Sequence, residues 1–136
     1  HSRDADEDMI KILKGEYKNG PFNAILHCFS SGSSLANCGL DLGFYVSFSG
    51  IVTFNSAKTI QKIAKNIPLD RILVETDSPY LSPEPYRGAS NEPKNCYFTA
   101  KFISDYRNID FVEFSHHTYN NAMTVFNRIL KWQNDK

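Results

Sequence analysis

The chain has 136 residues, of which 41% are hydrophobic and 22% charged, as in an ordinary soluble globular protein. Its 15 basic and 15 acidic residues cancel, so no net positive charge indicates a nucleic-acid partner, although a metal can supply positive charge locally. The 3 cysteines form no CxxC pair and are typical of reduced thiols in a cytoplasmic protein, and no apolar run is long enough for a membrane span.

The spacing of apolar residues changes from helical to strand-like along the first thirty residues. An amphipathic helix is expected near the start of the chain, and the turn at 19–21 ends it. The run 22–29 is expected to form a buried strand, in which Ile25, His27 and Phe29 share one face.

The alternation of helices and strands continues to the end of the chain. The expected elements are a short helix ending at Leu42, a strand at 44–48, a helix with Ile60, Ile63, Ala64 and Ile67 on one side, a strand at Ile72–Val74, a helix from Pro93 to near Arg107, and a final helix that Asp110 caps and that reaches Trp132. This order predicts an α/β fold with parallel strands and crossover helices. Because three strands alone make a poorly covered sheet, we expect further elements outside this chain.

Three candidate metal ligands, His1, His27 and Asp77, each precede a loop at or just past an expected strand end. Crossover topology places successive strand ends at one edge of the sheet, where the active sites of α/β proteins are built. Imidazole and carboxylate ligands from separate strands suit a catalytic divalent cation. Taken singly, these residues are also explained as a frayed chain end, a hydrogen-bonded core histidine and a turn-forming aspartate.

Several sequence segments resemble the TatD family of metal-dependent hydrolases. They are HSRDA at His1–Ala5, LHCFS at Leu26–Ser30, GFYVSFSGIVTF at Gly43–Phe54, ILVETDSPYLSPEPYRG at Ile72–Gly88, NEP at Asn91–Pro93 and TYNNAMTVF at Thr118–Phe126. The segments occur in the family's order and at its spacing, and together they cover essentially the whole chain.

The resemblance implies an amidohydrolase-like (β/α)8 barrel that hydrolyses phosphodiester bonds in DNA with divalent metal ions. It implies that His1 and His27 are metal ligands, and that Asp77 is both a ligand and the catalytic base that orients or deprotonates the attacking water. Two divalent ions are expected in a complete site, with Mg, Mn or Zn as candidates. No membrane partner is expected.

The chain also departs from the family's pattern. The Asp-x-His-x-His motif of the family's first strand and the bridging Glu of its fourth strand do not occur in it. We therefore expect residues 1–136 to be a single partial domain, the C-terminal half of the barrel. On its own the chain is expected to have little or no nuclease activity. The absent N-terminal half, or self-association, is expected to cover the open barrel.

Two further residues have alternative interpretations. Glu75 is expected to orient a metal ligand or bind a cation, or else to be a structural carboxylate inside the barrel. Arg87 is expected to contact a substrate phosphate, and a solvated loop arginine explains it equally well. Two alternatives to the nuclease also remain open: a non-catalytic remnant of such an enzyme, and a hydrolase of another ester such as aminoacyl-tRNA. Metal identity and exonuclease or endonuclease action stay open as well.

Overall fold

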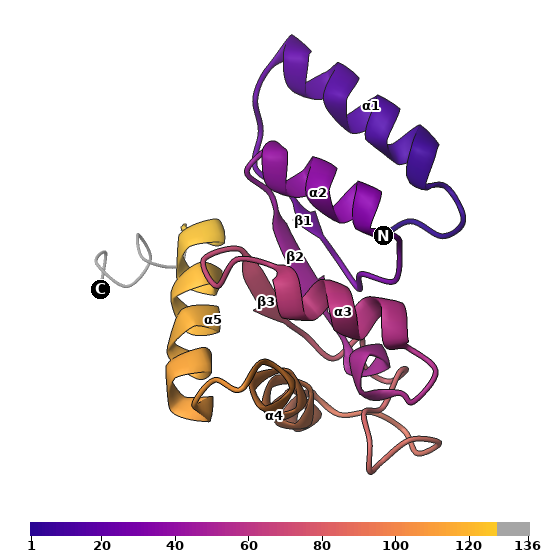
Figure 1. Cartoon of the computed structure of the whole chain (residues 1–136), viewed down its shortest axis with the longest axis vertical. Coiled ribbons are helices and arrows are strands. Elements are labelled where there is room, and N and C mark those ends of the chain that lie inside the picture. Colours follow the sequence, from indigo (N-terminus) through magenta and orange to yellow (C-terminus); the bar gives the residue numbers. More distant parts are fainter. Residues whose placement is uncertain (128–136) are drawn as a thin grey trace.

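A computed structural model describes residues 1–127 of the chain and shows a small parallel sheet packed among helices (Figure 1). The elements are α1 (Asp6–Asn19), β1 (Ile25–Leu26), α2 (Ser33–Asp41), β2 (Tyr45–Phe48), the 3-10 helix η1 (Gly50–Thr53), α3 (Lys58–Asn66), β3 (Ile72–Val74), the 3-10 helix η2 (Pro93–Asn95), α4 (Cys96–Arg107) and α5 (Phe111–Val125). This alternation confirms the expected α/β class.

The 3 strands lie in the order β1-β2-β3, and both neighbouring pairs are parallel. Tyr45 of β2 is paired with Ile25 of β1, and Val46 with Ile72 of β3. The sheet follows the order of the chain because each crossover helix returns the backbone beside the previous strand. All strands therefore end at the same edge, as the sequence predicted.

The first strand is much shorter than the expected run 22–29. Cys28 has a left-handed backbone with φ 47°, and it ends the extended conformation just after His27. The chain turns there, so that Phe29 is buried at 4% exposure and its backbone N–H bonds to the carbonyl of Ser47, 2.9 Å away. The predicted shared face of His27 and Phe29 was wrong for this reason: Phe29 enters the core while His27 stays at the sheet edge.

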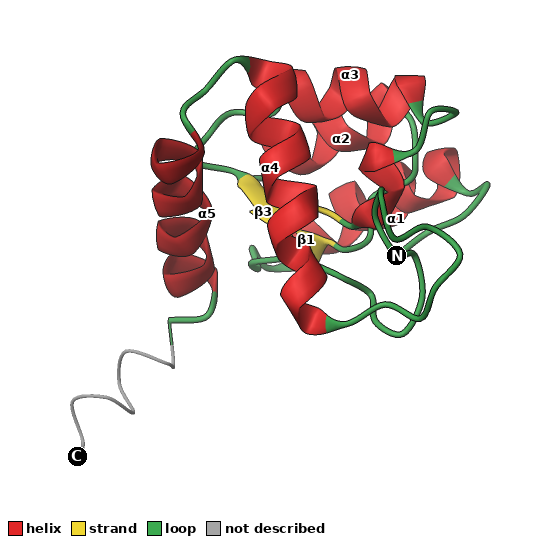
Figure 2. Cartoon of the chain, turned by 90° about the horizontal axis from the view of Figure 1, so that it is seen from below, coloured by secondary structure: helices red, strands yellow, loops and turns green. Residues whose placement is uncertain are grey.

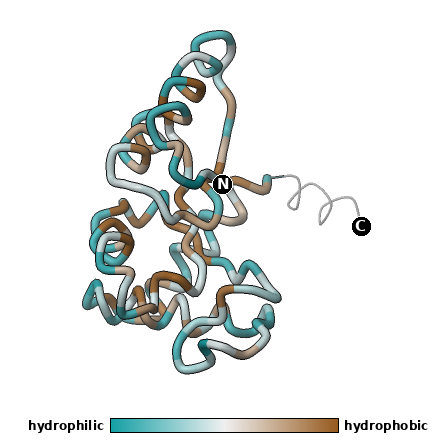
Figure 3. Tube along the Cα trace, turned by 90° about the vertical axis from the view of Figure 1, so that its right-hand side faces the viewer, coloured by the Kyte–Doolittle hydropathy of each residue, from teal (hydrophilic) through white to brown (hydrophobic). Residues whose placement is uncertain are grey.

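The core lies between the sheet and its covering helices. Figure 2 shows α4 crossing over the strands, with α5 to one side, and α5 and α4 both contact β3. The strand residues Val46, Phe48 and Ile72 are fully buried against Ile103 of α4 and Phe114 of α5. Figure 3 shows hydrophobic and hydrophilic positions alternating along the helical turns, as expected of amphipathic helices with one buried side.

The last described helix begins where the sequence predicted. The Asp110 carboxylate accepts hydrogen bonds from the backbone N–H groups of Val112 and Glu113, at 2.9 and 3.0 Å, which satisfies two donors at the start of α5. The predicted continuation to Trp132 lies outside the described residues. No helix within residues 1–127 is long and apolar enough to cross a membrane.

Gly50 holds η1 against the loop that follows β3. A Cβ atom at Gly50 would overlap the Leu81 carbonyl oxygen and would lie 2.8 Å from the Pro83 nitrogen, both backbone atoms. We therefore expect Gly50→Ala to lower the free energy of unfolding by about 1–3 kcal/mol, because the two segments must move apart. Urea unfolding monitored by circular dichroism measures this change.

Gly15 is the matched control for that substitution. It lies on the exposed side of α1, and nothing is within 4 Å of a Cβ built there. Gly15→Ala is expected to raise stability by about 0.5–1 kcal/mol, because alanine loses less backbone entropy in a helix. Equal effects of the two substitutions would show that the close approach at Gly50 does not constrain the fold.

Candidate metal centre

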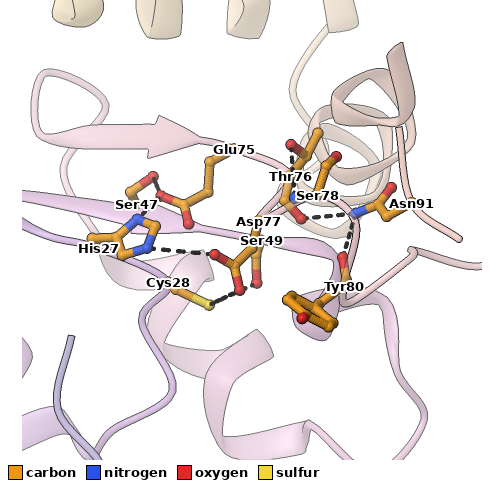
Figure 4. Close-up of polar contacts among 10 residues, drawn as sticks. All are labelled: His27, Cys28, Ser47, Ser49, Glu75, Thr76, Asp77, Ser78, Tyr80 and Asn91. Carbon is orange, nitrogen blue, oxygen red and sulfur yellow. Dashed lines mark hydrogen bonds and ion pairs between the residues drawn. The ribbon is translucent and has the colours of Figure 1, made fainter. Parts of the chain in front are cut away.

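Polar side chains gather at the edge of the sheet where the strands end (Figure 4). His27 directly follows β1, Ser49 directly follows β2, and Glu75 and Asp77 follow β3. The parallel topology brings these positions together although His27 and Glu75 are 48 residues apart in the chain. The clustering is therefore a product of the crossover connections.

His27 lies between the two carboxylates. Its Nδ1 is 2.9 Å from Glu75 Oε2, and its Nε2 is 3.6 Å from Asp77 Oδ1. Within the described part of the chain, these three residues form the one group of at least 3 histidine, cysteine or acidic side chains whose ligand atoms all lie within 4.8 Å of one another. The structure thus brings together two of the three predicted metal ligands, with Glu75 beside them.

Glu75 sets the orientation of the His27 ring. Its Oε2 accepts a hydrogen bond from the Ser47 hydroxyl and faces His27 Nδ1. A proton on Nδ1 completes this contact and leaves Nε2 as a lone pair directed toward Asp77. Carboxylates commonly hold metal-binding histidines in this way. This contact supplies the geometry by which Glu75 would orient a ligand, and that role stays a prediction.

The residues at this edge fit a divalent cation. With the proton on Nδ1, the imidazole lone pair and the Asp77 carboxylate face each other as two acceptors, and a cation between them would satisfy both. Two metal–ligand bonds of about 2.1 Å can span the 3.6 Å between Nε2 and Oδ1. Glu75 Oε1 is also buried without a hydrogen-bond partner among the described residues, as happens where a positively charged group or an ordered water belongs.

His1 lies near this group but not within it. The rings of His1 and His27 are 6.4 Å apart between centroids. His1 and Asp77 line the same cavity of about 350 Å³. The structure therefore places the third predicted ligand beside the group, on the wall of the cavity that Asp77 also lines.

Arg87 lies in a different place. Its guanidinium stacks over the Phe54 ring, 4.4 Å from the centroid, and it is exposed on the loop between β3 and η2. It does not line the cavity that contains Asp77. Stacking on an aromatic ring is a structural use of arginine. The phosphate contact by Arg87 stays a prediction.

Asn91 holds the loop of the site, a role that the sequence interpretation missed. Its side-chain N–H groups donate to the carbonyls of Thr76 and Tyr80, at 2.8 and 2.7 Å, and its Oδ1 accepts from the Glu92 N–H and from Asn95 Nδ2, at 2.9 and 3.0 Å. Asn91 is 4% exposed, so these bonds are protected from water. The NEP segment was its signal, but only the fold shows that Asn91 clamps the loop carrying Asp77.

The backbone at Asp77 and Cys28 is left-handed, with φ angles of 57° and 47°. Such conformations in residues other than glycine are uncommon and occur often at functional sites. The Cys28 thiol lies 3.3 Å from the Ser49 hydroxyl and 3.9 Å from Asp77 Oδ2. Burial raises the pKa of Cys28, the Ser49 contact opposes this, and the charges of Asp77 and Glu75 add to it. Cys28 is therefore a neutral thiol that can donate toward Asp77.

Cys96, at the start of α4, makes the stability of the fold depend on pH. Burial raises the pKa of the Cys96 thiol, and the Glu75 carboxylate raises it further. As pH rises through the ordinary thiol range, the unfolded chain releases this proton before the folded chain does. The Cys96 contribution to stability is thus fully present below that range and is lost as pH rises through the raised folded pKa.

We expect the free energy of unfolding to fall between about pH 8 and 11, and to fall less steeply in Cys96→Ala. Urea unfolding at a series of pH values measures both slopes. Identical slopes in the two proteins would show that the thiol is not perturbed by its surroundings.

The chain is similar in sequence and in structure to the proteins of one family. A family model described as TatD related DNase matches residues 1–127. A protein of Buchnera aphidicola, named an uncharacterized metal-dependent hydrolase, is 46% identical over 127 residues, which are 93% of this chain and 48% of that protein. YcfH of Escherichia coli has the same description and is 43% identical over 126 residues, or 93% of this chain and 47% of YcfH. The chain thus spans about half the length of the curated relatives that it matches.

Solved structures agree with the sequence relatives. The crystal structure of YJJV, a TatD homologue from Escherichia coli, superimposes with a TM-score of 0.85 at 25% identity, covering 93% of this chain and 48% of that one. A TatD family hydrolase from Entamoeba histolytica shares the fold, with a TM-score of 0.78 at 24% identity over 92% of this chain and 48% of that one. From the match over residues 1–127 and the identity to these relatives, we conclude that the chain belongs to the TatD related DNase family.

Proposed function

We propose that this chain carries part of the active site of a metal-dependent hydrolase that cleaves phosphodiester bonds, with DNA as the substrate class. The observation that carries this proposal is the approach of His27 and Asp77, whose Nε2 and Oδ1 atoms face each other at 3.6 Å at the open edge of the sheet. The printed description of the matching family, TatD related DNase, supports DNA as the substrate.

In this proposal His27 and Asp77, together with His1, would hold the metal, with up to two Mg, Mn or Zn ions in a complete site. When bound, a divalent cation supplies positive charge that lowers the pKa of water and stabilises negative charge on phosphate oxygens. A mixed imidazole and carboxylate donor set suits Zn and Mn, whereas Mg favours oxygen ligands. Metal identity is therefore part of the test.

The chain's own residues have separate tasks. Glu75 holds His27 through Nδ1, which directs Nε2 toward Asp77. Asp77 presents Oδ1 to His27 and leaves Oδ2 beside the Cys28 thiol. We assign Oδ2 as the atom that accepts the proton of the attacking water, because Asp77 lines the cavity through which a phosphodiester can approach. The thiol of Cys28 orients that carboxylate.

We further propose that the three strands are the C-terminal part of a (β/α)8 barrel of the amidohydrolase-like type. The parallel strands with crossover helices, and the superposition on about half of each TatD structure, support this. In such a barrel β1 would be paired on its free side, and further ligands would complete the metal site. A second polypeptide segment, or a second copy of this chain, would then be the partner of the sheet.

The test is hydrolysis of a single-stranded oligodeoxynucleotide with Mg²⁺, Mn²⁺ or Zn²⁺, by this chain and by a fusion of the chain to the unmatched half of its Buchnera relative. We expect activity in the fusion, loss of that activity with EDTA, and little activity in the chain by itself. Cleavage of an aminoacyl ester but not of DNA by the fusion would replace the proposed substrate. A fusion that folds and binds metal but hydrolyses neither would favour a non-catalytic protein.

A further inference from the structure

The cavity beside Asp77 has features that the metal centre does not use. It measures about 350 Å³, near the lower end of the range for small-molecule sites, and so has room for a group about the size of one nucleotide. Its walls come from the loops that follow all three strands and from the segment before α1. Two of its lining residues, Arg3 and Tyr80, have side chains with no role in holding His27 or Asp77.

Arg3 is the basic residue of this cavity that an anion could use. It is exposed, and within residues 1–127 it makes no ion pair and no hydrogen bond. Two other arginines are used structurally: Arg87 stacks on Phe54, and Arg107 donates to two backbone carbonyls at the end of α3. A guanidinium is a fork of donors whose geometry matches a phosphate group. Arg3 is therefore free to contact one.

Arg3 also lines a neighbouring cavity of about 460 Å³, which Asp4 and Asp6 line as well. Two carboxylates on its wall make this neighbouring cavity a poor place for a polyanion. The cavity beside Asp77 contains one carboxylate, and a metal at that carboxylate would remove the repulsion. A phosphate is therefore expected to meet Arg3 on the Asp77 side.

Tyr80 gives the same cavity an aromatic surface. Its side chain is 70% exposed, and Figure 4 shows it beside Asp77. Its backbone is nevertheless held firmly, because its N–H donates to the Asp77 carbonyl at 3.0 Å and its carbonyl accepts from Asn91 at 2.7 Å. An exposed ring on a fixed backbone can stack on a nucleobase at small entropic cost.

We propose that Arg3 and Tyr80 form a nucleotide-binding subsite next to Asp77, in which Arg3 contacts a phosphate and Tyr80 stacks on the adjoining base. This inference rests on the proposed function, because it assigns a binding position to the substrate of that function. It also moves the phosphate contact from Arg87, the residue predicted from the sequence, to Arg3. The two assignments predict opposite results: in one, substitution of Arg3 weakens binding, and in the other, substitution of Arg87 does.

The experiment measures fluorescence anisotropy of a labelled oligothymidylate mixed with the 136-residue chain in EDTA at low ionic strength, so that no hydrolysis occurs. We expect Arg3→Gln to weaken binding about tenfold and to reduce the slope of log affinity against log salt by about 0.7, the loss of one phosphate contact. Tyr80→Ala is expected to weaken binding at least about fivefold with the salt slope unchanged. Tyr80→Phe, which keeps the ring, is expected to bind like the wild type.

Three further variants make the result specific. Lys62→Gln removes the same charge from the exposed surface of α3 and is the matched control, expected to bind like the wild type. Arg87→Gln tests the sequence-based prediction and is expected to have little effect. Asp77→Asn removes the opposing charge from the same cavity, so it is expected to tighten metal-free binding if the ligand lies there.

The outcomes separate this inference from the proposed function. Equal weakening by Arg3→Gln and Lys62→Gln, unchanged binding in Tyr80→Ala, no tightening in Asp77→Asn, or no binding by the wild type would each overturn the subsite. Binding that depends on Arg3 and Tyr80, without hydrolysis by the metal-loaded fusion, would overturn the proposed function and leave the subsite in place. Circular dichroism of each variant checks that the fold is kept.

Discussion

Replacing Asp77 with Asn is expected to reduce metal-dependent hydrolysis by a protein with the complete site by about 10²–10⁴-fold, because the change removes a general base. The amide cannot take up a proton from water, and it faces His27 Nε2 with one oxygen and no charge. In the isolated chain we expect the affinity for Mn²⁺ or Zn²⁺ to fall by about 100-fold or more, since one ligand of the pair is lost. Isothermal titration calorimetry measures this without any need for activity.

The fold should tolerate this substitution. Asp77 has a left-handed backbone with φ 57°, a conformation that asparagine adopts readily. Asp41→Asn is the matched control, because Asp41 is an exposed carboxylate at the end of α2, away from the site. It is expected to leave metal affinity unchanged. Wild-type affinity and hydrolysis in Asp77→Asn would remove Asp77 from both of its proposed roles.

Replacing Asn91 with Ala is expected to lower the free energy of unfolding by about 2–4 kcal/mol, a large effect for a single side chain. The substitution leaves the carbonyls of Thr76 and Tyr80 without donors, and leaves the Glu92 N–H and the Asn95 amide without their shared acceptor. Because these bonds hold the loop at both sides of Asp77, metal affinity is expected to fall as well. Urea unfolding and calorimetry on the same preparation measure the two effects.

A second substitution separates the two halves of the clamp. Asn91→Asp keeps the acceptor for Glu92 and Asn95 but replaces the two donors with a carboxylate facing two carbonyl oxygens. If the donors to Thr76 and Tyr80 are what hold the loop, this variant loses at least as much stability as Asn91→Ala. Asn120→Ala, at an exposed position of α5, is the control and is expected to change stability by less than about 0.7 kcal/mol. A small effect of both Asn91 variants would show that the loop holds its shape without the clamp.

Much of the fold was predictable because the relevant signals are local. Apolar spacing along the chain indicated each helix and strand from α1 to α5, and the alternation indicated parallel strands. Asp110 could be identified as the N-cap of α5, because N-cap hydrogen bonds involve only the next three residues. The strand Ile72–Val74, followed by Glu75 and Asp77, was equally predictable, because the change from apolar to acidic residues occurs within a few consecutive positions.

The site needed contacts between residues far apart in sequence. His27 was a candidate ligand on its residue type, but its partners, Glu75 and Ser47, come from other strands and depend on the register of the sheet. Asn91 is 15 residues from Thr76, and no periodicity relates the two. Burial decided which polar atoms needed a partner, and burial is a property of the packed structure.

The sequence by itself determined the order of the elements, the family segments and the residue types available for chemistry. Only the tertiary structure decided how they are used. It ended β1 at Leu26 because Cys28 takes a left-handed turn, and it placed Arg3 beside Asp77 and Arg87 on Phe54. The physical reason is that hydrophobic periodicity and turn preferences act over a few residues. The position of a charged side chain depends on which loops the crossover helices bring to the same edge.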